Sequence, residues 1–219
     1  MSVNNKITGL FLTVEGGEGA GKSTNIKTIC DFLSVNNIDY IVTREPGGTD
    51  LAEQIRALLL APRVEPVAAK AELLLMFAAR AQHLENKILP ALARGQWVVC
   101  DRFTDATFAY QGGGREMGMK LIGQLEEIVQ QGLQPDCTFL LDLPIEVGMQ
   151  RASSRGDLDR FEQEELSFFE RVRATYLTRA EQDNTRFKII DASKDMAAVA
   201  DQLKSELQLL HDSRLGPNE

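Results

Sequence analysis

The sequence of 219 residues predicts an α/β fold of three layers, in which helices cover both faces of a mostly parallel sheet. One observation behind this prediction is that short apolar runs alternate with segments whose apolar residues recur at helical spacing. The other is a glycine-rich motif, G-x-x-x-x-G-K-[ST], at residues 16–23, between the first apolar run and the first helical segment. In this context the motif indicates a loop that binds phosphate groups.

This phosphate loop is the most specific feature of the chain. Its glycines allow backbone N–H groups to turn inward around a polyphosphate, and the next helix points its positive dipole end at the same anion. Lys22 is expected to contact the β- and γ-phosphates, and the Ser23 hydroxyl to bind Mg²⁺. The alternative, a glycine-rich turn without a ligand, is less favoured because a strand and a helix flank the motif. The residues expected to bind a nucleoside triphosphate are Gly16, Gly17, Glu18, Gly19, Ala20, Gly21, Lys22, Ser23 and Thr24.

The composition limits the classes of partner. A formal net charge of −8 argues against a nucleic-acid scaffold, so any basic site must be a local cluster. No apolar run approaches the roughly 18 residues of a membrane span, and the N-terminus lacks the apolar segment of a signal peptide. Cys30, Cys100 and Cys137 are far apart and lie in apolar patterns, which predicts buried thiols in a reducing compartment. We therefore expect a cytoplasmic protein that binds neither nucleic acid nor a membrane.

The elements after the phosphate loop follow in order. A second strand is expected at residues 38–43, and residues 44–48 form a sharp turn because they contain Pro and paired Gly. Thr49 or Asp50 can cap the next helix, which stops before Pro62. A longer helix is expected at residues 70–94, with a buried apolar centre that Arg80 interrupts.

The second half of the chain continues the alternation. The expected strands lie at residues 97–101, 137–141 and 186–190, and the expected helices at residues 121–129, 166–176 and 199–210. Residues 111–115 include three glycines and are expected to form a flexible turn. The tail after His211 is expected to fray. Because no linker or repeat interrupts this order, we expect a single domain over residues 1–219.

Charged residues follow two of the predicted strands. In a parallel α/β sheet, ligands bind at the carboxyl ends of the strands, so Asp101 is expected beside the phosphate loop as a second Mg²⁺ ligand. Arg44 and Arg102 also follow strands directly, and two guanidinium groups there suit the phosphate of an acceptor. The alternative for each arginine is a surface ion pair.

An acceptor that is itself a phosphate needs no general base, because its oxygen is already ionised near neutral pH. Catalysis then requires that two polyanions be aligned and that charge on the transferring group be neutralised. Residues 151–162 are polar, contain Gly and include three arginines, which suggests a lid that brings these side chains in on closure. The alternative is a solvated charged loop.

Five segments resemble bacterial thymidylate kinases, in the same order and between about Leu10 and Ile190. They are residues 15–23, 43–48 (Thr-Arg-Glu-Pro-Gly-Gly), 101–102, 110–115 (Tyr-Gln-Gly-Gly-Gly-Arg) and 158–162 (Leu-Asp-Arg-Phe-Glu). The resemblance implies the P-loop nucleoside monophosphate kinase fold and the reaction ATP + dTMP → ADP + dTDP, with Mg²⁺, in dTTP synthesis. It also implies a homodimer.

The resemblance further implies roles for single residues. Gly19 stands where some members have arginine, and members with glycine resemble the class whose catalytic arginines come from the lid. The implied catalytic residues are therefore Lys22, Arg102, Arg151, Arg155 and Arg160. The implied contacts to dTMP are Glu18 with the sugar 3′-hydroxyl, Arg44 and Arg102 with the phosphate, Arg80 with thymine, Tyr110 against a ribose 2′-hydroxyl, and Thr107 and Gln111 around the base.

The chain departs from the family at one position. Members of the family commonly have an aromatic residue that stacks on thymine, one helical turn before the arginine that corresponds to Arg80. That position is Met76, with Phe77 beside it, and both share the helix face of Arg80. Either side chain could cover the base. Two alternative functions also remain: another P-loop nucleotide or deoxynucleoside kinase, and a nucleotide-dependent switch without turnover. A GTP switch would need Asn-Lys-x-Asp, which the sequence lacks.

Overall fold

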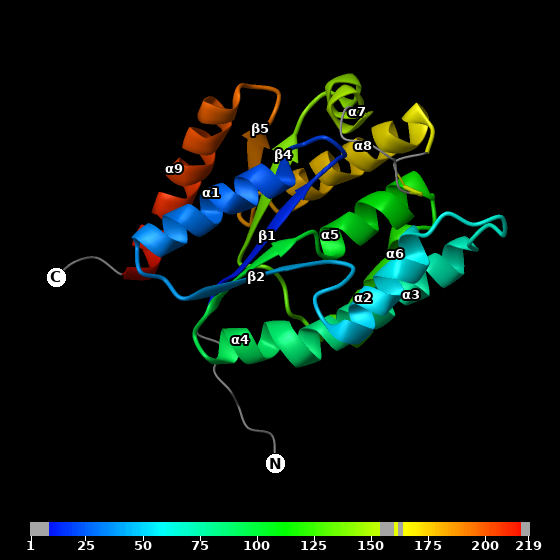
Figure 1. Ribbon diagram of the computed structural model, residues 1–219, viewed down its shortest axis with the longest axis horizontal. Coiled ribbons are helices and arrows are strands. Elements are labelled where there is room, and N and C mark those ends of the chain that lie inside the picture. The colour runs from blue at the N-terminus through cyan, green and yellow to red at the C-terminus, as the bar shows by residue number, and fades with distance from the viewer. Residues whose placement is uncertain (1–8, 154–159, 162–163, 216–219) are drawn as a thin grey trace, which may run out of the picture.

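The computed structural model describes residues 9–153, 160–161 and 164–215, and all structural statements below concern these residues. Within them, five strands form one sheet in the order β2-β3-β1-β4-β5, and each neighbouring pair is parallel. The strands are β1 (Phe11–Gly16), β2 (Tyr40–Arg44), β3 (Trp97–Asp101), β4 (Cys137–Asp142) and β5 (Phe187–Asp191). Because β1 is central, its carboxyl end brings the phosphate loop to the middle of one sheet edge (Figure 1).

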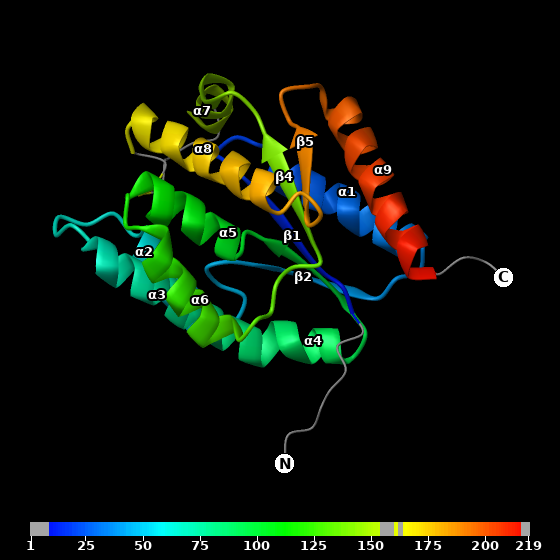
Figure 2. The same ribbon diagram turned by 180° about the vertical axis from the view of Figure 1, so that it is seen from behind.

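Helices cover both faces of the sheet, so the predicted three-layer architecture is confirmed (Figures 1 and 2). Helices α1 and α9 pack together on one face, whereas α4, α5 and α8 contact the strands from the other. The α-helices are α1 (Lys22–Val35), α2 (Asp50–Leu60), α3 (Ala69–His83), α4 (Leu89–Ala93), α5 (Thr104–Thr107), α6 (Met119–Gln130), α7 (Ile145–Ser153), α8 (Leu166–Gln182) and α9 (Met196–Leu215). Two π-helical segments, η1 (Leu84–Ile88) and η2 (Phe108–Gly114), continue α3 and α5.

The strands are apolar on both sides, as expected for a parallel sheet between two layers of helices. Leu12 and Val14 pack with α1 and α9, while Phe11, which precedes them on the chain, packs with residues of η1 and α4 on the opposite face. Each fully buried side chain of this kind stabilises the fold by about 1.5–3 kcal/mol relative to an exposed one. This burial fixes the strands in register and therefore fixes the edge where the site forms.

One sequence prediction about local structure was wrong. Residues 111–115 were expected to form a flexible turn, but Gln111 to Gly114 complete the π-helix η2 and pack against α8. Side chains at Gly113 and Gly114 would overlap Thr175 and Phe168 of α8. The glycines therefore allow close packing and do not provide flexibility.

Smaller differences concern element ends and one thiol. The helix expected at residues 70–94 is divided into α3, η1 and α4, and α9 continues past His211 to Leu215. Cys100 and Cys137 are buried as predicted, but Cys30 is only half-buried. All the helices of the described chain are too short or too polar to cross a membrane.

A buried ionic cluster ties α5 to α8 and to the start of β5. Asp105 is 2% exposed and accepts hydrogen bonds from Arg179 (2.7 Å) and Arg186 (2.6 Å). Arg186 also pairs with the surface carboxylate of Asp183 at 2.8 Å. The two carboxylates thus share a guanidinium but differ strongly in exposure.

We predict that Asp105→Ala lowers the free energy of unfolding by about 3–5 kcal/mol, because two guanidinium groups lose their buried partner. Asp183→Ala is the matched control and should cost less than about 1 kcal/mol, since its ion pair is solvated. Urea unfolding of both variants measures the difference. Equal losses would show that the Asp105 cluster contributes no more than a surface pair.

Candidate functional site

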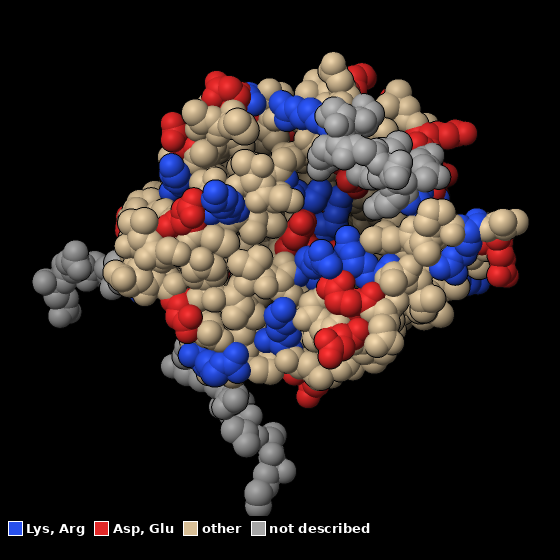
Figure 3. All heavy atoms as spheres, viewed as in Figure 1, with Lys and Arg blue, Asp and Glu red and all other residues tan. Residues whose placement is uncertain are grey.

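A cavity of about 260 Å³ opens at the carboxyl ends of β1, β2 and β3. It is bounded by the phosphate loop on one side and by α3, α5 and η2 on the other. Four basic side chains line it, from Lys22, Arg56, Arg80 and Arg102. Figure 3 shows Lys and Arg side chains gathered around a hollow in this face of the molecule. The cavity is therefore suited to anions although the whole chain is acidic.

The phosphate loop adopts a conformation that requires glycine. Gly16, Gly19 and Gly21 have φ values of 143°, 69° and 82°, which side-chain-bearing residues rarely adopt. Lys22 Nζ donates to the carbonyl oxygens of Gly16 and Gly17 at 3.3 and 3.1 Å. Burial and the nearby Arg102 lower the pKa of Lys22, and this unfavourable environment would be relieved by phosphate oxygens.

Gly19 also sets the distance between the loop and α7. A side chain at position 19 would overlap the carbonyl group of Gly148, and one at Gly148 would approach the carbonyl oxygen of Glu18 to 2.5 Å. An arginine at position 19 therefore cannot fit unless α7 moves. The packing of the loop on α7 therefore depends on glycine at position 19.

Glu18 and Arg102 form the centre of the cavity wall. Arg102 has a left-handed backbone (φ 64°) and donates to Glu18 Oε1 at 2.7 Å and to the Gly16 carbonyl at 2.9 Å. Tyr110 donates its hydroxyl proton to the same Glu18 oxygen at 2.6 Å, with its ring 4.7 Å from the Arg102 guanidinium. Burial raises the pKa of Tyr110 well above its ordinary value, so the phenol stays protonated and remains a donor.

Arg80 lies at the base of the cavity and is 2% exposed. Its Nε donates to Glu45 at 2.7 Å and its Nη2 to Thr107 at 2.9 Å, whereas Nη1 has no partner among the described residues. The sequence left Met76 and Phe77 as alternatives beside it. Met76 lines the cavity, but Phe77 is buried among Leu73, Phe108 and Ile122 under the guanidinium, so the expectation for Phe77 was wrong.

Arg44 and Arg160 do not line the cavity, and neither does Arg151. Arg44 forms an exposed ion pair with Glu53 at 2.9 Å, and Arg160 pairs with buried Glu72 at 2.6 Å. Arg56 of α2 is present instead, and it donates to the Pro46 carbonyl at 2.9 Å. Arg56 forms no direct ion pair with any described residue, although the charges of Glu53 and Asp101 act on it from a greater distance. Arg155 lies outside the described residues.

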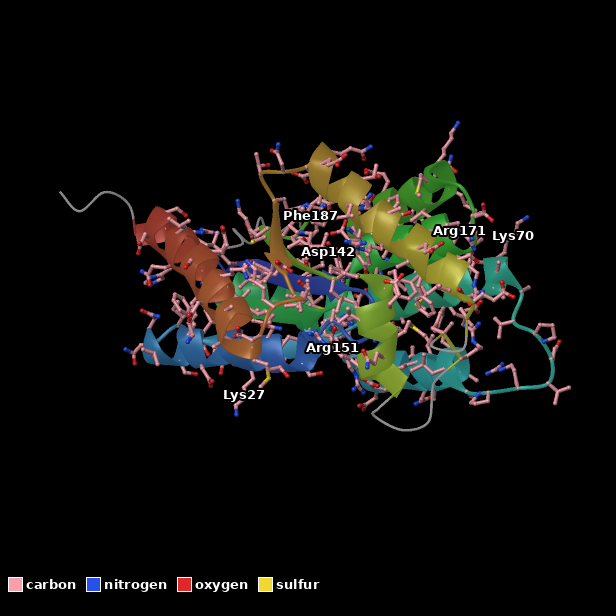
Figure 4. The ribbon with its side chains drawn as sticks, turned by 90° about the horizontal axis from the view of Figure 1, so that it is seen from above. Lys27, Lys70, Asp142, Arg151, Arg171 and Phe187 are labelled. Atoms are coloured by element: carbon pink, nitrogen blue, oxygen red, sulfur yellow. The ribbon has the colours of Figure 1, made fainter. Side chains whose placement is uncertain are left out.

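A second cavity of about 300 Å³ lies on the other side of the phosphate loop. Gly19, Ala20 and Gly21 line both cavities, and Thr24 of α1 lines only the second. Arg151 of α7 borders this cavity and donates to the carbonyl oxygen of Ala192 at 2.9 Å. Figure 4 shows Arg151 where α7 approaches the start of α1, while Lys27 points away from the site. The loop thus separates two hollows that meet at its glycines.

Comparisons with known proteins identify the family. The family model described as thymidylate kinase matches residues 14–203. The chain belongs to the thymidylate kinase family. A thymidylate kinase from Teredinibacter turnerae is 58% identical over 202 residues, covering 92% of this chain and 98% of the relative. One from Chromohalobacter salexigens is 59% identical, covering 91% and 95%. The crystal structure of thymidylate kinase from Ehrlichia chaffeensis superposes with a TM-score of 0.73 at 33% identity, covering 91% and 98%.

The family assignment and the P-loop nucleoside monophosphate kinase fold confirm what the motifs indicated. The first cavity brings together most of the predicted residues: Glu18, Gly19, Ala20, Gly21, Lys22, Ser23, Met76, Arg80, Asp101, Arg102, Thr107, Tyr110 and Gln111. Sequence reasoning missed Arg56 and Glu45. Arg56 gave no signal because it lies on an amphipathic helix, where a charged residue is ordinary. Glu45 lies within the turn at residues 44–48, so the motif could have suggested it.

Behind the cavity, Glu15 is a fully buried carboxyl group at the end of β1. It accepts hydrogen bonds from the Phe103 backbone at 2.6 Å and from the Tyr176 hydroxyl at 2.7 Å. Burial, together with the negative charge of Asp105, raises the pKa of Glu15 to about 8. The folded protein therefore holds this proton more tightly than the unfolded chain does.

We predict that this difference makes stability fall with rising pH between about 4.5 and 8, because the unfolded chain releases the Glu15 proton first. The free energy of unfolding of wild type relative to Glu15→Gln should decrease from pH 5.5 to pH 8.5 in urea titrations. Glu53→Gln is the control and should show no such fall, since Arg44 lowers the pKa of Glu53. A difference between wild type and Glu15→Gln that is independent of pH would refute the shift.

Proposed function

We propose that this protein transfers the γ-phosphoryl group of ATP to dTMP, giving ADP and dTDP, as the names of its relatives indicate. The observation that carries the proposal is the pair of cavities that meet at Gly19, Ala20 and Gly21. A donor in one cavity and an acceptor in the other would approach each other across the phosphate loop. Such an arrangement suits in-line transfer between two bound nucleotides.

On the donor side, the loop glycines and Lys22 bind the polyphosphate, and the nucleoside occupies the second cavity. Arg151 borders that cavity, whereas Arg160 is held by Glu72 and by the Leu59 carbonyl oxygen. Of these two predicted catalytic arginines, Arg151 is therefore the better placed in this conformation. Arg155 remains a third candidate within the expected lid at residues 151–162.

On the acceptor side, different residues bind the base, the sugar and the phosphate of dTMP. Nη1 of Arg80 binds a carbonyl group of the base, and Met76 covers the ring. Tyr110 and Glu18, joined at 2.6 Å, face the sugar. Arg102 binds the phosphate together with Arg56, which takes the place expected for Arg44, because only Arg56 of these two lines the cavity. The phosphate oxygen attacks without a general base, since it is already ionised.

The residues present fit a Mg²⁺ ion. Oδ1 of Asp101 is buried without a partner among the described residues, and Ser23 lines the same cavity. The described chain contains no cluster of three or more acidic, His or Cys side chains that could hold a metal. One carboxylate and one hydroxyl suit Mg²⁺, which usually keeps waters and completes its shell with substrate phosphates. When bound, it would supply charge neutralisation on the phosphates.

We also propose that the protein is a single-domain homodimer. Leu51 and Leu58 of α2, Leu74 of α3 and Ile128 of α6 are between 50% and 69% exposed. Helix α3 packs against both α2 and α6, so these side chains come from neighbouring elements. An exposed apolar surface of this kind favours association between protein chains. A cytoplasmic location is supported by the three cysteines, which form no disulfide and suit a reducing compartment.

The test of activity compares dTMP, dUMP, AMP and CMP as acceptors while ADP release is followed. We predict that dTMP is preferred, and that Lys22→Ala lowers its turnover by about 10²–10³-fold, because a charge on the transferring phosphate is lost. Lys27→Ala, which removes an exposed lysine of the same helix, should retain wild-type turnover. Preference for another monophosphate would contradict the assigned substrate, and an active Lys22→Ala would contradict the phosphate-loop assignment.

The test of assembly is sedimentation equilibrium. We predict twice the monomer mass for wild type and the monomer mass for Leu74→Glu, because a buried unpaired carboxylate would destabilise the interface. Leu166→Glu on α8, whose side chain is 48% exposed in the monomer, is the matched control and should stay dimeric. A monomeric wild-type protein would disprove the dimer, and a Leu74→Glu variant that stays dimeric would place the interface elsewhere.

A further inference from the structure

A buried chain of polar side chains runs from β2 to the cavity through His83, a residue to which the sequence assigned no role. Thr43 Oγ1 lies 2.6 Å from His83 Nε2, and His83 Nδ1 lies 3.0 Å from Glu45 Oε1. Glu45 Oε2 accepts the hydrogen bond from Arg80 Nε at 2.7 Å. His83 is 0% exposed and Glu45 5% exposed, so water does not compete for these bonds.

The donors and acceptors along this chain fix its geometry. An ionised carboxylate only accepts hydrogen bonds, so His83 Nδ1 carries a proton and donates it to Glu45. Each oxygen of Glu45 then has one donor, His83 for Oε1 and Arg80 for Oε2. The carboxylate cannot rotate without losing one of the two. Glu45 consequently holds the guanidinium in one orientation, and Thr107 takes its Nη2.

The backbone of the turn at residues 44–48 is shaped around the imidazole ring. Gly48 has a φ of 90°, and a side chain there would overlap both the His83 ring and the Thr43 hydroxyl. His83 comes from the end of α3, whereas Thr43, Glu45 and Gly48 come from β2 and its turn. The ring therefore joins two elements that both contribute residues to the cavity wall.

Nη1 of Arg80 is the atom that matters for recognition of the base. It is buried and has no partner among the described residues. Because Glu45 already neutralises the guanidinium charge, Arg80 is suited to a neutral carbonyl group more than to a phosphate. Arg56 lines the same cavity without a direct ion pair to any residue that the structure describes, and it suits the phosphate. The pairing with Glu45 thus suits Arg80 to the base, whereas Arg56 is suited to the phosphate.

We propose that His83 is a positioning residue for the acceptor base: through Glu45 it orients the Arg80 guanidinium at the cavity wall so that Nη1 is left for a carbonyl group of the base. His83 touches neither the nucleotide nor the reacting atoms. The inference rests on the proposed function, because it assumes that a carbonyl-bearing base occupies the cavity.

The experiment measures the affinities of dTMP, of 2-deoxyribose 5-phosphate, which lacks the base, and of ATP. The proteins are wild type, His83→Leu, Arg80→Ala and the double variant. We expect His83→Leu to weaken dTMP binding about 10-fold, as for one hydrogen bond to a charged group, while the other two ligands keep their affinities. In the Arg80→Ala background, His83→Leu should have no further effect on dTMP.

Two conservative variants allow the same test if His83→Leu does not fold. His83→Gln can still donate to Glu45 and should recover part of the dTMP affinity, whereas Thr43→Val removes the hydroxyl partner of Nε2 without changing α3. Thr43→Val should weaken dTMP binding in the same selective manner as His83→Leu. Circular dichroism is used to check that each variant is folded.

Two outcomes would show that His83 only supports the fold and would overturn the inference. One is a loss of dTMP affinity from His83→Leu that adds to the loss from Arg80→Ala. The other is an equal loss of affinity for all three ligands. Unchanged dTMP affinity in both His83→Leu and Thr43→Val would overturn it as well. These outcomes are distinct from failure of the proposed function, which would appear as a wild-type protein that does not phosphorylate dTMP.

Discussion

Three arginines, two of which line the cavity, are held by carboxylates from elements distant in the chain. Arg102 pairs with Glu18 of the phosphate loop, Arg80 with Glu45 of the turn after β2, and Arg160 with Glu72 of α3. Removing one partner of a buried pair typically costs about 3–5 kcal/mol, so these pairs cannot be separated cheaply. The site is therefore organised by the requirement that a buried guanidinium group must have a partner.

Whether a guanidinium group has a carboxylate partner also determines which kind of ligand group it suits. A guanidinium that shares its charge with a carboxylate keeps its remaining N–H groups for a neutral acceptor, whereas an unpaired one keeps its full charge for an anion. Arg80 belongs to the first kind and Arg56 to the second. The same type of side chain thus has two different electrostatic characters in one cavity, because the surroundings differ.

A second constraint is the close packing of the phosphate loop on α7. Gly19 and Gly148 face each other with no room for a side chain on either. The contact brings α7, and with it Arg151, next to the loop glycines that line both cavities. The position of Arg151 is then set by backbone contact, which a side chain at position 19 would disrupt.

The sequence by itself determined the alternation of strands and helices, the phosphate loop and the family, because these depend on local patterns and on residues adjacent in the chain. Only the tertiary structure decided which side chains meet. Met76 and Phe77 differ by about 100° around α3, and packing turned Met76 to the cavity and Phe77 to the core. Arg56 lines the cavity and Arg44 does not, because the orientation of α2 against the sheet is not encoded in either residue. The glycines at 112–114 form a buried helix, and His83 joins β2 to α3, because each depends on contacts between segments that are far apart in the sequence.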